Sequence, residues 1–224
     1  MYDTLLQLPL FQGLCETDFT AIIEKVKFHF HNYSSNEVIA HQNEPCNSLI
    51  FLLNGEVVAK TRQPDLNFTL SEVITSPAII EPYSLFGMNV NFTSTYQVKT
   101  KARLLTIDKS YILTELNKYE IFRLNYINLL SNRAQSAHKI LWNLKIGSIQ
   151  EKLLQFLTVR CQYMTGQKTL SITMEDLSMN INETRINVSR LLNELQDREL
   201  IQLKRKKIII PSIEKLLDGF GYQP

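Results

Sequence analysis

Cysteine, glycine and long apolar runs are all scarce in this sequence of 224 residues. The three cysteines, Cys15, Cys46 and Cys161, are far apart. A disulfide framework, an iron–sulfur cluster or a cysteine-ligated metal needs paired or clustered thiolates, so we expect none of them. No apolar run reaches the roughly 18 residues that a membrane-spanning helix needs. The chain also begins without a basic segment followed by an apolar one, so we expect no signal peptide. The scattered cysteines favour a reducing compartment, so a cytoplasmic location is expected.

Support for an enzyme is equally scarce. The sequence holds only seven glycines and no glycine-rich loop of the kind that cradles phosphates. It also lacks an HExxH motif, a serine–histidine–aspartate set and carboxylates paired at a catalytic spacing. We therefore expect a binding protein that is not an enzyme.

The first half of the chain alternates apolar and polar residues, with turn residues between the short runs. Many short strands at near-regular spacing predict an antiparallel roll, barrel or sandwich. A short helix is expected over 18–24, before the first strand. The expected strands cover residues 26–33, 37–41, 48–53, 56–61, 68–73, 96–100 and 104–107.

A long helix is predicted over 118–145, where apolar residues recur at intervals of 3, 4, 3, 4 and 3. This is the spacing of a and d positions in a two-stranded coiled coil, and it is narrower than the face of a helix packed on its own domain. The stripe consists of Ile127, Leu130, Ala134, Ala137, Leu141 and Leu144. We expect it to form the seam of a homodimer; an amphipathic helix packed on its own domain is the alternative.

Gly147 is expected to end the long helix. The next residues begin another helix, because Ser148 and Glu151 have the spacing of a capping box. A hinge and a domain boundary are predicted here.

Two short helices follow residue 172. Thr173 is a typical N-cap for the first, with acidic residues in the first turn, Leu177 as the main buried position and an end at Asn180. Asn182 or Thr184 can cap the second helix. Helix, short turn and helix is the arrangement whose second helix enters the major groove of DNA.

The second helix has two kinds of residue. Its apolar residues are expected to hold it to the neighbouring helix: Ile186, Val188, Leu191, Leu192 and Leu195. Its polar residues near the N-terminal half are expected to face outward: Arg185, Asn187, Ser189 and Arg190. Arginine can bond guanine, asparagine can bond adenine, and serine can bond a base or a phosphate.

Two β-prone runs, 200–203 and 208–210, are joined by the basic segment Lys204, Arg205, Lys206 and Lys207. A basic hairpin tip beside a recognition helix indicates a winged helix that neutralises DNA phosphates. Thr173 and Thr184 are further candidates for phosphate contacts.

These residues resemble the Crp/Fnr family of regulators. The segment 172–197, ITMEDLSMNINETRINVSRLLNELQD, is similar to the helix-turn-helix of that family, and LPLFQGL at 8–14 resembles its opening signature. The runs HQNE at 41–44 and GEV at 55–57 resemble its cyclic-nucleotide-type β-roll. The resemblance implies a sensor roll, a dimerisation helix and a DNA-binding winged helix, with RNA polymerase as a further partner.

Carried over by position, Arg185 and Arg190 match the arginines of the family's recognition helix. The family's common glutamate falls on Ile186, which cannot accept a hydrogen bond from cytosine. We therefore expect the operator of this protein to depart from the family's usual consensus.

The effector pocket departs further from the family. The resemblance implies a pocket formed by Glu81, Ser84, Leu85, Ser94 and Thr95, in which Ser94-Thr95 takes the place of the family's phosphate-binding Arg-Ser pair. A buried phosphate without a cation is costly, so we expect no tight cyclic AMP binding. A haem remains an alternative for the histidines of the chain, although isolated histidines in strands are usually structural: His29, His31, His41 and His138.

The expected fold is therefore α+β. It comprises a β-roll sensor domain over 1–117, a dimerisation helix over 118–147 and a winged-helix DNA-binding domain over 148–224. The expected function is a homodimeric transcription regulator that binds double-stranded DNA and senses an unidentified small molecule or none. The alternative is a small-molecule-binding module whose C-terminal domain binds protein instead of DNA.

Overall fold

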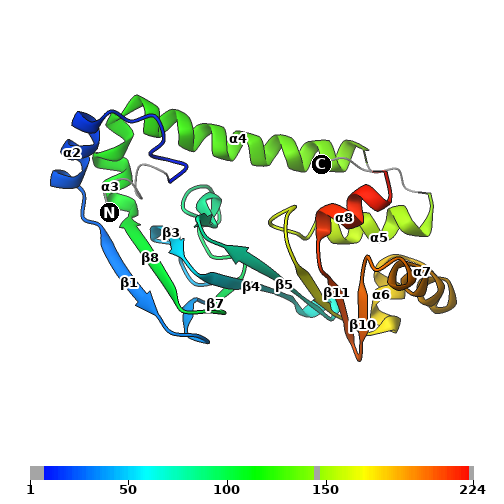
Figure 1. Ribbon diagram of the computed structural model, residues 1–224. Helices are drawn as coiled ribbons and strands as arrows, with labels where there is room; N and C mark the ends of the chain where they lie inside the picture. The colour runs from blue at the N-terminus through cyan, green and yellow to red at the C-terminus, as the bar shows by residue number, and fades with distance from the viewer. Residues whose placement is uncertain (1–7, 144–146, 222–224) are drawn as a thin grey trace. The chain divides into compact units, whose positions relative to one another are not determined.

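The computed structural model describes residues 8–143 and 147–221, with side chains for 8–138 and 147–221 (Figure 1). The chain divides into two compact units. The first comprises Met1–Val58 and Ile74–Gln135, and the second comprises Ala59–Val73 and Ser136–Pro224. The chain therefore crosses between the units three times, and residues 59–73 belong with the C-terminal unit. The domain boundaries at residues 117 and 147 stay predictions.

The first unit is built on an antiparallel sheet with the strand order β1-β8-β3-β6. Strand β3 lies inside it, with Phe51 opposite Leu105 on one side and Ile79 on the other. Four consecutive residues of β3 are buried, which explains its uninterrupted apolar run. The strands from this region are β1 (His29–Tyr33), β2 (Val38–Ala40), β3 (Ser48–Asn54), β4 (Glu56–Gln63), β5 (Phe68–Thr75), β6 (Ala78–Ile80), β7 (Thr95–Val98) and β8 (Ala102–Asp108).

Three helices accompany the strands of this region. Helix α2 is Glu16–Lys25, α3 is Lys109–Thr114 and α4 is Glu120–Asn143, with short 3-10 turns at Pro64–Leu66, Pro82–Ser84 and Leu116–Lys118. Phe11, from the opening LPLFQGL segment, is fully buried. Its ring centroid lies 5.7 Å from that of Phe19 on α2 and 5.5 Å from that of Phe122 on α4. The opening signature thus ties the first helix to the long one.

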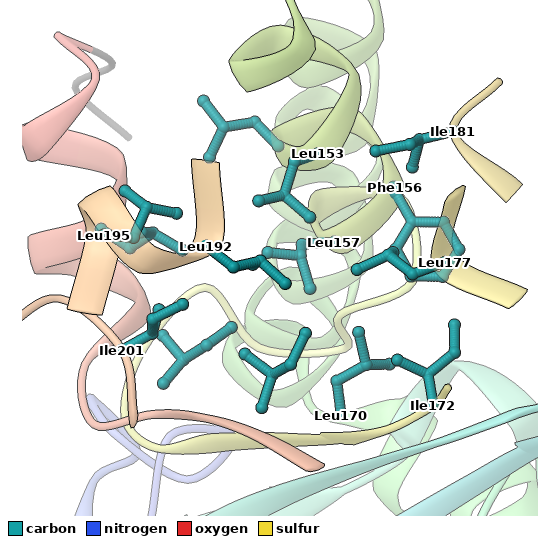
Figure 2. Packing of buried hydrophobic residues seen from close by; sticks show 14 of the residues in the cluster. Leu153, Phe156, Leu157, Leu170, Ile172, Leu177, Ile181, Leu192, Leu195 and Ile201 are labelled. Carbon is teal, nitrogen blue, oxygen red and sulfur yellow. The ribbon is translucent and has the colours of Figure 1, made fainter. Parts of the chain in front are cut away.

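The C-terminal part folds as a winged helix. Its elements are α5 (Ile149–Thr158), β9 (Lys168–Ser171), α6 (Met174–Asn180), α7 (Arg185–Asp197), β10 (Gln202–Lys204), β11 (Lys207–Ile210) and α8 (Ile213–Gly219). Figure 2 shows Leu153 and Leu157 of α5 directed toward Leu192 of α7, with Leu177 of α6 nearby. One apolar cluster therefore fixes α6 and α7 on α5.

The hairpin β4–β5 extends the sheet of this C-terminal domain. Strand β5 pairs antiparallel with β9, with Leu70 opposite Leu170 and Glu72 opposite Lys168. Phe68 enters the same apolar cluster as the winged-helix residues, and its ring centroid lies 5.3 Å from that of Phe156. This pairing explains why residues 59–73 belong to the second unit.

A buried ion pair anchors the hairpin. The Lys168 ammonium lies 3.1 Å from a carboxylate oxygen of Glu72, and neither side chain has any exposed surface. Glu72 also accepts hydrogen bonds from the backbone N–H groups of Gln162 and Tyr163, while Lys168 donates one to the carbonyl of Thr165. Every charge is thus matched, as buried ions require.

The expected fold class is confirmed, with local differences in the elements. The first strand begins at His29, three residues later than predicted, because Val26 still donates its N–H to Ile22 at the end of α2. Strand β6 and helix α3 were not predicted, since each is too short to develop a clear period. Helix α4 ends at Asn143. The predicted continuation to residue 145 lies outside the described residues, so the role of Gly147 as its end stays a prediction.

Candidate nucleic-acid interface and effector pocket

Helix α7 is held by its apolar side and capped at its start. Thr184 is the N-cap, and its hydroxyl accepts a hydrogen bond from the N–H of Asn187. The inward side consists of Val188, Leu191, Leu192 and Leu195, all buried. This leaves the other side of the helix in solvent. Three of the predicted base-contacting residues, Arg185, Asn187 and Arg190, are exposed, and Ser189 is half-buried.

Ile186 does not belong to the packing side, contrary to expectation. It was grouped with the apolar residues that hold α7, but its side chain is 72% exposed. The physical reason is helical phase, because residues two positions apart point in different directions on a helix of 3.6 residues per turn. Ile186 therefore lies on the surface beside Arg185.

The helix before it, α6, is fixed by its cap and its core. Thr173 is the N-cap, with its hydroxyl accepting a hydrogen bond from the N–H of Asp176 and donating one to the carboxylate of the same residue. Leu177 is fully buried, as predicted. Both threonines expected to contact phosphate, Thr173 and Thr184, thus lie at helix N-termini, where backbone N–H groups favour an anion.

The turn between the helices is pinned to α5 by a salt bridge. The Lys152 ammonium lies 2.7 Å from a carboxylate oxygen of Glu183 and also donates to the carbonyl of Asn182. The hydrogen bond from Lys152 holds the pKa of the Glu183 carboxyl below its usual value, and a weaker one from Asn187 adds to this effect. The side-chain amide nitrogen of Asn187 donates this hydrogen bond and lies 3.4 Å from the Glu183 carboxylate.

The basic segment forms the predicted hairpin tip. Lys204 pairs with Lys207 across β10 and β11, and Arg205 and Lys206 make the turn. Lys206 has a φ of 55°, in the left-handed region, and its carbonyl accepts from the N–H of Ile172. All four basic side chains are exposed. They form a compact cationic group on the same domain as α7.

The predicted effector pocket is closed by its own side chains. Glu81 has no exposed surface, and Ser84, Leu85 and Ser94 are also buried. Its carboxylate accepts hydrogen bonds from the Ser84 hydroxyl at 2.7 Å and from the backbone N–H of Thr93 at 2.6 Å. The fifth predicted residue, Thr95, is half-buried and accepts from the N–H of Gln42.

Tyr96 completes this network and was not predicted. Its hydroxyl donates to the second oxygen of Glu81 at 2.6 Å, and it is among the largest fully buried side chains. The nearby Cys46 thiol has its pKa raised to about 11, first by burial and then by the negative charge of Glu81. Cys46 is therefore a neutral thiol at neutral pH, and the charge of this site comes from the Glu81 carboxylate.

Two cations near this segment are stacked on aromatic rings. The Arg133 guanidinium lies 3.8 Å from the ring centroid of Tyr83, and the Lys109 ammonium lies 4.8 Å from that of Phe86. The segment 80–95 itself contains no lysine, arginine or histidine. The hydroxyl of Tyr126 on α4 donates to the carbonyl of Pro82, which ties the turn to the long helix.

The dimer stripe faces solvent over the part that is described. Ile127 is 51% exposed, Ala134 and Ala137 are exposed, and Leu130 is half-buried. The side chains of Leu141 and Leu144 lie outside the described residues. The stripe thus leaves apolar surface on α4 that the residues described in the structure do not cover.

Two of the four histidines, His29 and His31, are stacked on β1 with their ring centroids 6.4 Å apart. His29 lies 3.8 Å from the Asp108 carboxylate, and His31 shares a hydrogen bond with the Thr106 hydroxyl. Across residues 8–138 and 147–221, no three histidine, cysteine, aspartate or glutamate side chains come together in a way that could hold a metal. In the same part of the chain, no helix has the length and apolar character needed to cross a membrane.

Comparison with known families agrees with this arrangement. Residues 30–119 match the Cyclic nucleotide-binding domain family, and residues 151–218 match the Crp-like helix-turn-helix domain. The chain belongs to the Crp/Fnr family of transcription regulators. It combines a cyclic-nucleotide-binding-type domain with a DNA-binding helix-turn-helix, as that family does.

Individual relatives are distant. The cAMP-activated global transcriptional regulators CRP of Salmonella typhimurium and Klebsiella aerogenes are each 23% identical over 190 residues, covering 81% of this chain and 89% of theirs. The Thermus thermophilus catabolite activator protein has a TM-score of 0.55 at 18% identity, covering 96% of this chain and 100% of its own. The regulator CLP of Xanthomonas campestris, described as c-di-GMP responsive, has a TM-score of 0.51 at 15% identity, covering 88% and 99%. The two structures support the fold.

Proposed function

We propose that this regulator acts as a homodimer that binds a near-palindromic DNA site without requiring cyclic AMP. The observation that carries the DNA-binding part is the capped helix α7, which presents Arg185 and Arg190 to solvent on the same rigid core as the basic hairpin tip. A recognition helix with arginines in its first turns suits guanine in the major groove.

The hairpin tip supplies the contacts that do not depend on sequence. Lys204, Arg205, Lys206 and Lys207 are exposed and lie at a turn, where they can follow a phosphate backbone. Phosphate contacts of this kind position a protein on the duplex, while base contacts specify the sequence. Thr173 and Thr184 offer two helix N-termini to further phosphates.

We propose that the dimer forms through the apolar stripe of α4. An exposed a/d stripe is stable only when a second stripe covers it, and a second copy of the chain provides an identical one. Two recognition helices would then read half-sites roughly 34–36 Å apart, one turn of DNA. RNA polymerase is a further partner on the family resemblance.

The roll is proposed to bind no cyclic nucleotide tightly. In Glu81, both carboxylate oxygens are engaged by Ser84, Thr93 and Tyr96, so a ribose hydroxyl would have to displace existing hydrogen bonds. A cyclic phosphate would enter a site whose own segment has no cation and contains the Glu81 carboxylate, while the nearby Arg133 and Lys109 are stacked on Tyr83 and Phe86. Both effects oppose binding. Relatives described as cAMP-activated or c-di-GMP responsive therefore do not define the effector of this chain.

The proposal is tested by selecting bound duplexes from random DNA with the full chain and no added nucleotide. We expect a near-palindromic consensus whose affinity falls steeply with salt, because counterions are released from phosphates. Leu130→Glu should produce monomers in light scattering and remove most of the operator affinity, whereas Asn132→Glu, off the stripe, should leave the dimer intact. Failure to retain any duplex at moderate salt would favour a protein-binding C-terminal domain.

A further inference from the structure

Ile186 lies at the centre of the surface that α7 turns toward solvent. The buried residues Val188, Leu191, Leu192 and Leu195 define the inward direction of this helix. At about 100° per residue, Ile186 points about 170° away from the mean of those four directions. No residue in the first turn of α7 points more directly outward.

Its chemistry is unusual for that place. Ile186 is 72% exposed, and it stands between Arg185 and the exposed Arg190 in sequence. A branched aliphatic side chain cannot donate or accept a hydrogen bond, so it gains nothing from water or from the polar edge of a base. The two arginines favour an anionic partner, and the isoleucine favours an apolar feature on that same partner.

A DNA duplex has one feature of this kind in its major groove, the C5 methyl group of thymine. Given the DNA-binding function proposed above, we infer that Ile186 contacts a thymine methyl in each half-site and thereby selects a T·A pair at that position. Glutamate at this position would instead accept a hydrogen bond from the cytosine amino group. The substitution of isoleucine for glutamate thus changes which base is selected.

The test replaces single thymines of the selected operator by deoxyuridine, which removes the methyl group and leaves base pairing unchanged. Burial of one methyl group is expected to contribute about three- to fivefold in affinity. One thymine per half-site should therefore show a loss of about three- to fivefold on replacement, and replacing it in both half-sites should give about nine- to twenty-five-fold. Binding is measured by fluorescence anisotropy at fixed salt.

Variants of the protein assign the effect to Ile186. Ile186→Ala should bind the thymine and deoxyuridine duplexes equally, with no change in thermal unfolding because the side chain is exposed. Met179→Ala is the matched control, since Met179 is an exposed apolar residue at the end of α6. It should keep the full thymine-to-uridine ratio. Ile186→Glu should move the preferred base in a new selection from thymine to cytosine.

The outcomes separate the two proposals. If a consensus is bound but no deoxyuridine replacement weakens wild-type binding, or if Ile186→Ala keeps the wild-type ratio, Ile186 does not read a thymine methyl. If no duplex is retained at all, the DNA-binding function fails and the inference fails with it.

Discussion

Glu81 in the roll and Arg185 on α7 are both charged, but their surroundings are opposite. Glu81 has no exposed surface and accepts three hydrogen bonds from its own chain. Arg185 is exposed, and the described residues give it no hydrogen bond or ion pair. A charge that is satisfied internally stabilises the fold, whereas an exposed charge on a rigid helix is available to a partner. On this contrast we propose that Arg185 takes part in recognition and that Glu81 has a structural role.

The hairpin β4–β5 is a second place where a charged side chain has its partners within the chain. Its Glu72 pairs with Lys168, and its Phe68 lies in the apolar cluster of the winged helix. Asn67 adds a hydrogen bond to Asp176, and Asn180 donates to the carbonyl of Leu66. A segment from within the roll sequence thus contributes to the domain that carries α7.

The largest effect is expected at the buried ion pair. Lys168→Met leaves the Glu72 carboxylate without its counter-ion and should lower the free energy of unfolding by about 3–5 kcal/mol. Urea denaturation measures this. Lys204→Met, at an exposed lysine on β10 of the same sheet, should change the stability by less than about 0.5 kcal/mol. Equal effects of the two variants would show that the β5–β9 pairing is absent in solution.

The structural role of Glu81 is tested by its removal. Glu81→Ala leaves the buried Tyr96 hydroxyl, the Ser84 hydroxyl and the Thr93 N–H without their acceptor, so the free energy of unfolding should fall by at least about 1–3 kcal/mol. If Glu81 were instead reserved for a ligand, its removal would leave the stability of the free protein nearly unchanged. Chemical denaturation without any nucleotide distinguishes the two results.

Arg185→Ala tests whether the exposed arginine on α7 contacts a DNA base. Loss of a bidentate contact to guanine should weaken operator binding by about 1–3 kcal/mol and relax the base preference. The stability of the protein should stay the same because the side chain is exposed. An equal loss on operator and random DNA, measured by anisotropy, would contradict a base-contacting role.

A smaller effect is expected at the hairpin tip. Lys206→Ala should weaken binding to all sequences alike and lower the slope of log affinity against log salt by about 1. The measurement is a salt titration on operator and random duplexes. A change confined to the operator would mean that Lys206 reads sequence.

The smallest effect concerns pH. The pKa of Glu183 is lowered in the folded state, mainly by the hydrogen bond from Lys152, so its contribution to stability is present above the unfolded value of 4.5 and is lost as the pH falls through the folded value. Glu183→Gln should therefore be less stable than wild type at neutral pH and equal to it in strong acid. Thermal unfolding at both pH values measures the difference; a constant difference would exclude this linkage.

Local features of the fold could be predicted because local sequence determines them. The alternation of apolar and polar residues predicted most of the strands. The predicted N-caps Ser148, Thr173 and Thr184 are all present. The basic run 204–207 is at a hairpin tip, as its flanking β-prone residues indicated. These elements depend on neighbours within a few positions.

The long-range features could not be predicted in the same way. Glu72 and Lys168 are far apart in the sequence, and no local pattern around either residue predicts that the two form an ion pair. A signal did exist: Glu72 follows Phe68 and Leu70 with a period of two, which places a charge on the buried side of its strand. The hydrophobicity of Ile186 predicts burial, but its phase on the helix places it on the exposed side of α7.

Operator binding measured with and without saturating cyclic AMP tests the central claim most directly. The full chain is titrated into a selected duplex and into the same duplex with its half-sites scrambled. We predict tight binding to the operator alone, with the same dissociation constant whether or not the nucleotide is present. Binding that appears only when cyclic AMP is added would contradict the account, as would equal binding to both duplexes.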